Sequence, residues 1–220
     1  MGGPKALLAW LDGAAGSGAV PVPLAVAHAR ARLGVDCERV LVVASPEVVA
    51  RLAGWLAAQA GELHAGLELV PATSPDPAGS IAAALAHGRL GPLVLLTPVD
   101  CPPAGPRSVA ALRSALALAP AKLAARPRHA GRGGHPVLVR RAALAPYASP
   151  APPPLRELLR SLGPALAEVE VDDPSVLADL DTPASLAAYG CGVPRFFGGG
   201  GLDDEVAAPA RDEREQEGRR

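Results

Sequence analysis

The sequence predicts an α/β protein in which short buried strands alternate with helices around a mostly parallel sheet. Leu93–Leu96 is an unbroken run of apolar residues, which is typical of a strand buried on both faces of such a sheet. Strand-like and helical segments follow one another at short intervals, and this order predicts parallel strands joined by right-handed crossovers. The length of 220 residues, 49% of them apolar, suits one domain of this kind with a tail.

Caps and apolar runs set the expected boundaries of these elements. Ser45 is expected to cap a helix that has Pro46 at its first position, and Ser80 to cap a short alanine-rich helix that ends at Gly88. The expected strands are 39–44, 67–70, 93–96, 122–125, 137–139 and 168–171. The expected helices are 23–33, 46–59, 81–87, 107–118, 155–162 and 183–189. Loops are expected over 12–19 and 129–134.

Charge and composition exclude several classes of function. The net charge of −1 gives no general attraction to nucleic acids or membranes, and an aromatic content of 3% argues against a surface on which bases stack. Cys37, Cys101 and Cys191 lack the spacing of a zinc site and are interpreted as free thiols in a reducing compartment. With no bilayer-spanning run and no signal peptide at the start, we expect a cytoplasmic protein.

The composition divides the chain near residue 190. We expect one domain over 1–189, followed over 190–220 by a glycine-rich linker and a charged tail. Residues 203–220 contain seven acidic residues and four arginines with hardly any apolar residues. Such a segment cannot bury enough apolar surface to order itself, so the tail is expected to be disordered.

Asp100 comes just after the run Leu93–Leu96, at the carboxyl end of the expected strand. In open α/β sheets, ligands bind in the crevice beyond these strand ends. Pro98 and Pro102 restrict the backbone around the acid, so the carboxylate would be well placed to hold a divalent metal and a phosphate chain. The alternative is an aspartate that caps a turn or the next helix.

Gly2-Gly3-Pro4-Lys5 is a second candidate piece, because backbone amides freed by glycines next to a lysine can hold phosphates. Lys5 and Lys122 are the two lysines in a chain with nineteen arginines, and a compact ammonium is suited to phosphate. The alternative is a frayed start with an exposed lysine.

Two further pieces carry a histidine and a pair of acids. His135 follows a glycine-rich stretch and could donate to an anionic group, or it could be a surface imidazole at a hairpin-like turn. Asp179 and Asp181 alternate at strand spacing, so they should point to the same side and share a cation. Alternatively, Asp181 or Thr182 caps a helix whose first residue is Pro183.

Taken in order, four motifs resemble the MobA-like nucleotidyltransferase family, most closely its molybdenum cofactor cytidylyltransferase branch. They are Met-Gly-Gly-Pro-Lys-Ala-Leu-Leu at the start, Val-Asp-Cys-Pro around Asp100, Gly-Arg-Gly-Gly-His-Pro-Val-Leu around His135, and Asp-Leu-Asp-Thr-Pro at 179–183. The pair of Gly-His-Pro and Asp-x-Asp-Thr-Pro is the more specific part of the likeness. The resemblance covers about residues 1–189.

The resemblance implies a Rossmann-like three-layer α/β sandwich and Mg²⁺-dependent transfer of a nucleotidyl group from an NTP, with CTP favoured and release of pyrophosphate. The acceptor would be a small phosphorylated molecule such as molybdopterin. Lys5 would contact the triphosphate with the backbone of Gly2, Gly3 and Pro4. The metal would lie on Asp100 with Asp181 as a second carboxylate, Ser80 near the base and ribose, and His135 on the acceptor side.

The chain also departs from the family. The family opens with a strand and a glycine-rich loop of the form Leu-Ala-Ala-Gly-x-x-x-Arg-Met-Gly-x-Pro-Lys, and this sequence starts at the Met inside that motif. The lost strand would be central in the sheet, so its neighbours are expected to have exposed edges. Either the natural start lies upstream of Met1, or the activity has been lost. We favour the first because Lys5, Asp100 and the later motifs are present.

Two other classes of function stay open from the sequence. A glycosyltransferase of related fold would use Asp179 and Asp181 as its metal pair, but it leaves Gly-Gly-Pro-Lys without a role. A non-catalytic module that binds a nucleotide or a partner follows if Met1 is the true start.

Overall fold

The computed structural model describes residues 4–11, 20–59, 66–74, 76–189, 191 and 194–197. The α-helices are α1 Leu24–Arg32, α2 Pro46–Ala58, α3 Pro77–His87, α4 Pro106–Leu118, α5 Leu155–Leu162 and α6 Pro183–Ala187. The 3₁₀ helices are η1 Lys5–Leu7, η3 Arg141–Ala148, η4 Gly163–Ala165 and η5 Pro174–Leu177. The strands are β1 Ala9–Leu11, β2 Pro21–Pro23, β3 Val40–Ala44, β4 Leu67–Pro71, β5 Leu93–Leu96, β6 Ala124–His129, β7 Arg132–Gly133, β8 Val137–Arg140 and β9 Leu166–Glu170.

The larger sheet has five strands in the order β5-β8-β6-β7, with β9 on the other edge of β6. The α/β class is confirmed, but the sheet is mixed rather than mostly parallel. β6 pairs with β9 in parallel, whereas β8 pairs with both β5 and β6 in antiparallel fashion. The reason is local: the chain turns back through the β6–β7–β8 segment without a crossover helix, so β8 returns alongside β6 in the opposite direction.

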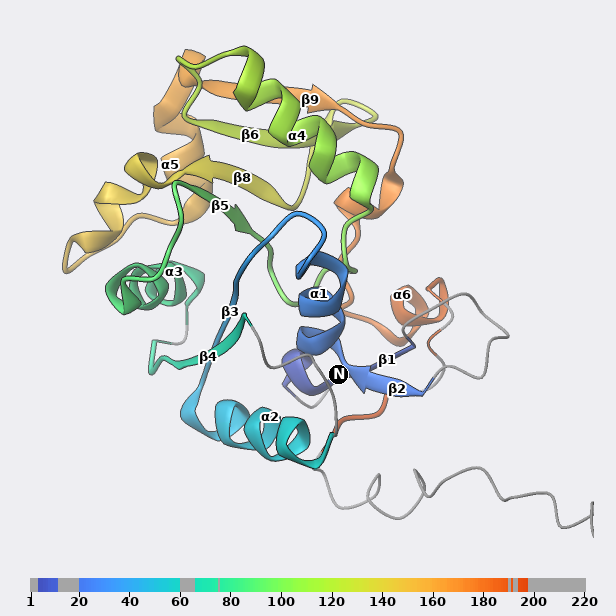
Figure 1. The fold of residues 1–220 in the computed structure, drawn as a ribbon. Coiled ribbons are helices and arrows are strands. Elements are labelled where there is room, and N and C mark those ends of the chain that lie inside the picture. The colour runs from blue at the N-terminus through green and yellow to red at the C-terminus, as the bar shows by residue number, and fades with distance from the viewer. Residues whose placement is uncertain are drawn as a thin grey trace, which may run out of the picture.

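Helices cover both faces of this sheet, which gives the expected three layers (Figure 1). Alternation along β8 sends Val137 and Val139 to one face and Leu138 to the other. The first face packs against residues of α3, η3 and α5, including the fully buried Tyr147. The second face packs against Leu112 and its neighbours on α4.

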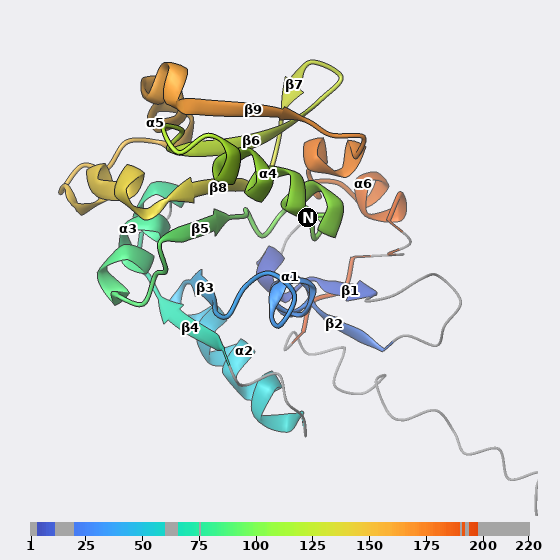
Figure 2. The same cartoon turned by 45° about the horizontal axis from the view of Figure 1, so that its top comes forward.

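A smaller parallel sheet, β3 paired with β4, belongs to a second core. This core joins α1 and α2 to the β1–β2 hairpin and to Leu180 and Leu186 near the end of the fold. Leu7 and Leu8 at the start of the chain are fully buried in the same core. Figure 2 shows the strands in the order β9, β6, β8, β5, with β3 and β4 beyond β5. The first and last parts of the fold are therefore packed together beside the strand that leads to Asp100.

β3 and β5 each have one edge that pairs with no strand among the residues that the structure describes. The prediction that 93–96 is buried on both faces is wrong, since Leu93 is 37% exposed and the rest of β5 is half-buried. Every residue of β3 is also half-buried. Open edges leave the apolar residues of these two strands incompletely covered.

Several local expectations are corrected. Asp76, not Ser80, caps α3, because its side chain accepts a hydrogen bond from the amide of Gly79 at 2.7 Å. The segment 129–134 is a tight hairpin between β6 and β7, with positive φ at Ala130 and Gly131. The hairpin of β1 and β2 was not expected from the sequence. The expected loop over 12–19 and most of the expected tail lie outside the described residues.

The three cysteines are free thiols, as predicted. Among the described residues, none of the helices combines the length and the apolar character needed to cross a bilayer.

Amide hydrogen exchange along β5 tests the open edge. Arg141 donates its amide to the Pro92 carbonyl, and antiparallel alternation then directs the amides of Val94 and Leu96 toward β8 and those of Leu93 and Leu95 toward the open edge. We expect protected amides at Val94 and Leu96 and fast exchange at Leu93 and Leu95, measured by NMR. Equal protection of all four amides would show that another segment pairs with this edge.

Candidate functional site

Three carboxylates meet where β5 ends and the segment before α6 passes it. They belong to Asp100, Asp179 and Asp181, and one oxygen from each lies within 4.8 Å of the others. Asp100 follows β5, whereas the other two come from an extended segment almost eighty residues later in the chain. The structure therefore brings together the two predicted metal ligands, Asp100 and Asp181, and adds Asp179.

Backbone geometry explains how the two segments meet. The amide of Leu180 donates to the carbonyl of Asp100 at 2.7 Å. The Leu180 side chain is fully buried in the core that contains α1 and α2. In an extended segment, neighbouring side chains point to opposite sides, so burial of Leu180 turns Asp179 and Asp181 outward together. The predicted common orientation of these two acids is thus confirmed.

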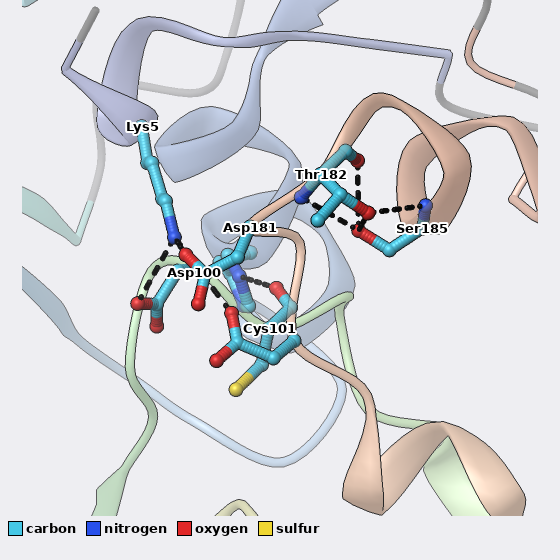
Figure 3. A network of polar contacts seen from close by, with 8 residues as sticks. Lys5, Asp100, Cys101, Asp181, Thr182 and Ser185 are labelled. Atoms are coloured by element: carbon cyan, nitrogen blue, oxygen red, sulfur yellow. Dashed lines mark hydrogen bonds and ion pairs between the residues drawn. The ribbon is translucent and has the colours of Figure 1, made fainter. Parts of the chain in front are cut away.

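The ammonium of Lys5 lies among the three carboxylates, and Figure 3 shows it pointing toward Asp100 and Asp181. Its Nζ is 3.5 Å from an oxygen of Asp100 and 3.7 Å from one of Asp179, and it makes its closest contact with Asp181. Lys5 opens η1, which is anchored by the buried Leu7. The Lys5 side chain is 22% exposed, whereas those of Asp179 and Asp181 are more than half exposed. The cluster is therefore open to ligands from solvent on the carboxylate side.

Thr182 rather than Asp181 caps α6. The Thr182 hydroxyl accepts from the amide of Ser185 at 3.0 Å, and the Ser185 hydroxyl accepts from the amide of Thr182, which completes a capping box (Figure 3). Because Thr182 satisfies the helix end, the carboxylate of Asp181 is left for Lys5 and for a ligand.

His135 lies close to the cluster. Burial lowers the pKa of His135, and the charges of Asp100 and Asp179 act in the opposite direction. Its Nδ1 is buried and has no hydrogen-bond partner among the described residues. The backbone is held in place, since the His135 amide donates to the Val176 carbonyl at 2.8 Å. A Cβ on Gly134 would collide with that same carbonyl, so glycine is required there.

The other predicted residues are not brought to the cluster. Ser80 is half-buried in the first turn of α3, and its hydroxyl donates a weak hydrogen bond to the Asp76 carbonyl at 3.5 Å. Pro4 precedes η1, where its carbonyl accepts from the Leu7 amide. Gly2 and Gly3 lie outside the described residues. The roles of Ser80, Pro4 and the two glycines in nucleotide binding stay predictions.

Cys101 is next to Asp100 but is unsuited to ligate a metal. Burial, with help from the charges of Asp100 and Asp179, raises the pKa of the Cys101 thiol to about 12. The thiol is therefore protonated near pH 7, and sulfur is a poor ligand for the hard cations that carboxylates bind.

The strand-like spacing of Asp179 and Asp181 predicted a shared cation, but the ligand set implied by the family resemblance named Asp100 and Asp181 and left Asp179 out. Sequence reasoning gave no role to His28, whose Nε2 lies 2.9 Å from the Cys101 carbonyl. A single histidine in an alanine-rich helix carries no recognisable pattern, so nothing in the sequence pointed to that contact.

The donor set fits a hard divalent cation. Carboxylate oxygens are the ligands that Mg²⁺ and Mn²⁺ prefer, and three of them within 4.8 Å repel one another unless a positive charge lies between them. Lys5 supplies that charge in this structure. A metal bound to the same oxygens would compete with the ammonium of Lys5, and Lys5 would then be free to contact a phosphate.

A comparison with known protein families covers most of the chain. The model of the MobA-like NTP transferase domain matches residues 1–169. The chain belongs to this family. No curated protein matches it, but solved structures do. The matched region ends before Asp179 and Asp181. The segment that carries these two acids nevertheless packs, through Leu180, in the same apolar core as Leu7.

Solved relatives share the fold of this MobA-like protein at low identity. Rv0371c from Mycobacterium tuberculosis H37Rv is 22% identical, with a TM-score of 0.59 over 86% of this chain and 89% of that one. The same protein, also at 22% identity, in complex with manganese gives 0.58 over 86% and 92%. CMP:2-keto-3-deoxy-manno-octonic acid synthetase complexed with CTP is 16% identical, with a TM-score of 0.58 over 84% and 89%. These neighbours establish a nucleotidyltransferase-type α/β fold.

Replacement of Lys5 separates its two expected roles. We expect Lys5→Met to bind Mn²⁺ alone about three- to tenfold more tightly, because no ammonium competes for the carboxylates, and to bind CTP with Mn²⁺ more weakly. Electron paramagnetic resonance of Mn²⁺ and calorimetry with CTP measure the two affinities.

Lys122→Met is the matched control, since Lys122 donates to the Pro164 carbonyl at 2.6 Å and takes no part in the cluster. It should leave both affinities unchanged. An Mn²⁺ affinity of Lys5→Met equal to that of the wild type would contradict competition between the ammonium and the metal.

Proposed function

We propose that this protein transfers a nucleotidyl group from an NTP, with CTP favoured, to a small phosphorylated acceptor such as molybdopterin and releases pyrophosphate. Its family is one of nucleotidyltransferases, and a fold neighbour was solved with CTP. The finer assignment to molybdopterin rests on the likeness of the Gly-His-Pro and Asp-x-Asp-Thr-Pro motifs. We propose residues 1–189 as the catalytic domain, because Leu186 of α6 packs in the same core as Leu7.

The observation that carries the proposal is the convergence of Lys5 with Asp100, Asp179 and Asp181 at the carboxyl end of β5. A lone acidic cluster would bind a cation and nothing more. A lysine at the same point adds a positive charge that can bind a phosphate chain. Acids and a cation side by side suit a metal–triphosphate complex, in which both charges are present.

In the proposed mechanism, each residue binds or orients. Asp100 and Asp181, with Asp179, would hold Mg²⁺, which when bound neutralises charge on the α-phosphate and the leaving pyrophosphate. Lys5 would leave the carboxylates and contact the β- and γ-phosphates. The backbone of Pro4 would run beside the same phosphates, and Ser80 would lie near the base and ribose.

The reaction needs no covalent intermediate. An oxygen of the acceptor phosphate attacks the α-phosphorus in line, and the bond from that phosphorus to the β-phosphate oxygen breaks as pyrophosphate leaves. His135 would line the acceptor side, where its ring can donate to or accept from an anionic group. The protein contributes position and charge, because Asp100 and Leu180 are fixed to each other through the backbone.

Replacement of the central carboxylate tests the proposal. Asp100→Asn should lower the rate of pyrophosphate release from CTP, Mg²⁺ and molybdopterin by about 100-fold or more, because it removes a charged metal ligand. Asp172→Asn is the control, since Asp172 is exposed and outside the cluster. Equal rates for the two variants would contradict a role for Asp100 in the reaction.

A non-catalytic nucleotide-binding module is the second candidate, and it is favoured by the edges of β3 and β5 beside the site, which pair with no strand among the described residues. It predicts that CTP with Mg²⁺ raises the melting temperature by mass action while no NTP yields pyrophosphate. That pair of results would reject the transferase proposal. A glycosyltransferase would instead hydrolyse a nucleotide sugar and tolerate Asp100→Ala, but it leaves Lys5 without a role.

A further inference from the structure

Helix α1 faces the loop that carries Asp100 and holds it with two side chains. His28 and Arg32 are one helical turn apart, so they lie on the same face of α1. His28 Nε2 is 2.9 Å from the carbonyl of Cys101, and Arg32 Nη2 donates to the carbonyl of Ala104 at 2.8 Å. One helix face thus binds the loop between β5 and α4 at two points.

His28 contacts the backbone on both sides of Asp100. Cys101 follows Asp100 directly, and the backbone of Val99, which precedes it, also interacts with the His28 ring. The other described hydrogen bonds of the peptide groups in this turn come from the backbone: the Cys101 amide donates to the Pro98 carbonyl at 3.3 Å, and the Leu180 amide donates to the Asp100 carbonyl. Among the described contacts, His28 is therefore the side chain that holds the peptide groups on either side of the acid.

The His28 imidazole is neutral near pH 7. Burial lowers the pKa of His28 to about 4, which outweighs the opposite effect of the Cys101 backbone contact. A neutral imidazole that donates from Nε2 has one tautomer, with the proton on that nitrogen. The bond to the Cys101 carbonyl thus fixes both the ring and the proton.

Arg32 serves the loop at a greater distance from the acid. It is 8% exposed, and Asp36 neutralises its charge through a bond of 2.7 Å. Arg32 donates to the carbonyl of Ala104, which is four residues beyond Asp100, so Arg32 stabilises the far end of the loop. The direct influence on the position of the Asp100 carboxylate therefore belongs to His28.

We propose that His28 is a positioning residue of the metal site, which fixes the Asp100 carboxylate relative to Asp179 and Asp181 through the Cys101 carbonyl. This inference rests on the proposed function, because it assumes that the three carboxylates bind a divalent cation. Groups that orient metal ligands through hydrogen bonds typically change metal affinity by about 10–100-fold when they are removed.

Mn²⁺ binding to the full chain tests the inference. His28→Leu removes the donor and should weaken Mn²⁺ binding about tenfold, as measured by electron paramagnetic resonance. His28→Gln places an amide nitrogen at nearly the reach of Nε2 and should bind within about threefold of the wild type. His28→Asn has the same chemistry but too short a reach, so it should behave like His28→Leu.

His129→Leu is the matched control, because His129 Nδ1 makes a bond of the same 2.9 Å to the Val171 carbonyl and not to the Asp100 loop. It should lose stability without losing Mn²⁺ affinity. If His28→Leu does not fold, the comparison of His28→Gln with His28→Asn gives the same answer.

The outcomes separate the inference from the proposed function. A wild-type chain that binds no Mn²⁺ removes the proposed function. A wild-type chain that binds Mn²⁺, together with equal affinities for the wild type and all folded His28 variants, overturns the positioning role alone. A loss of affinity with His28→Asn but not with His28→Gln supports it.

Discussion

Three carboxylates held close together are the constraint around which this structure is arranged. Asp100, Asp179 and Asp181 present oxygens within 4.8 Å of one another, and each pair of such charges repels by about 1 kcal/mol even in water. The fold accepts this repulsion because Lys5 lies between the acids. A side chain from the start of the chain thus balances the carboxylates that the end of the fold brings to β5.

The core makes this arrangement possible. Leu7, beside Lys5, and Leu180, between the two later acids, are both fully buried in one apolar cluster with residues of α1. Helix α1, which packs in the same cluster, adds the contact of His28 with the Asp100 loop. Each charged group at the site therefore has a buried neighbour that fixes its backbone. Burial of apolar side chains therefore supplies the free energy that assembles the site, and it brings the neighbouring charged side chains together.

Local signals in the sequence predicted the parts of this site, but not their assembly. Asp100 after a strand and the alternation of Asp179 with Asp181 could be read from spacing, because both depend on neighbours along the chain. The sheet order could not: the antiparallel return of β8 depends on a tight hairpin at Ala130 and Gly131, which looks like any glycine-rich loop. The contact of His28 with Cys101 joins residues 73 apart and leaves no periodic trace.

The formal charges at the site favour a metal–nucleotide complex over a free nucleotide as its ligand. Three carboxylates and one ammonium leave a formal charge of −2, which a divalent cation balances. A free triphosphate would meet net repulsion there, whereas a triphosphate with its metal brings the cation that the carboxylates need. In the proposed function, the three carboxylates would hold the metal in place of the Lys5 ammonium, and Lys5 would then contact the phosphates. Cation and nucleotide should therefore each strengthen the binding of the other, through one lysine that exchanges partners.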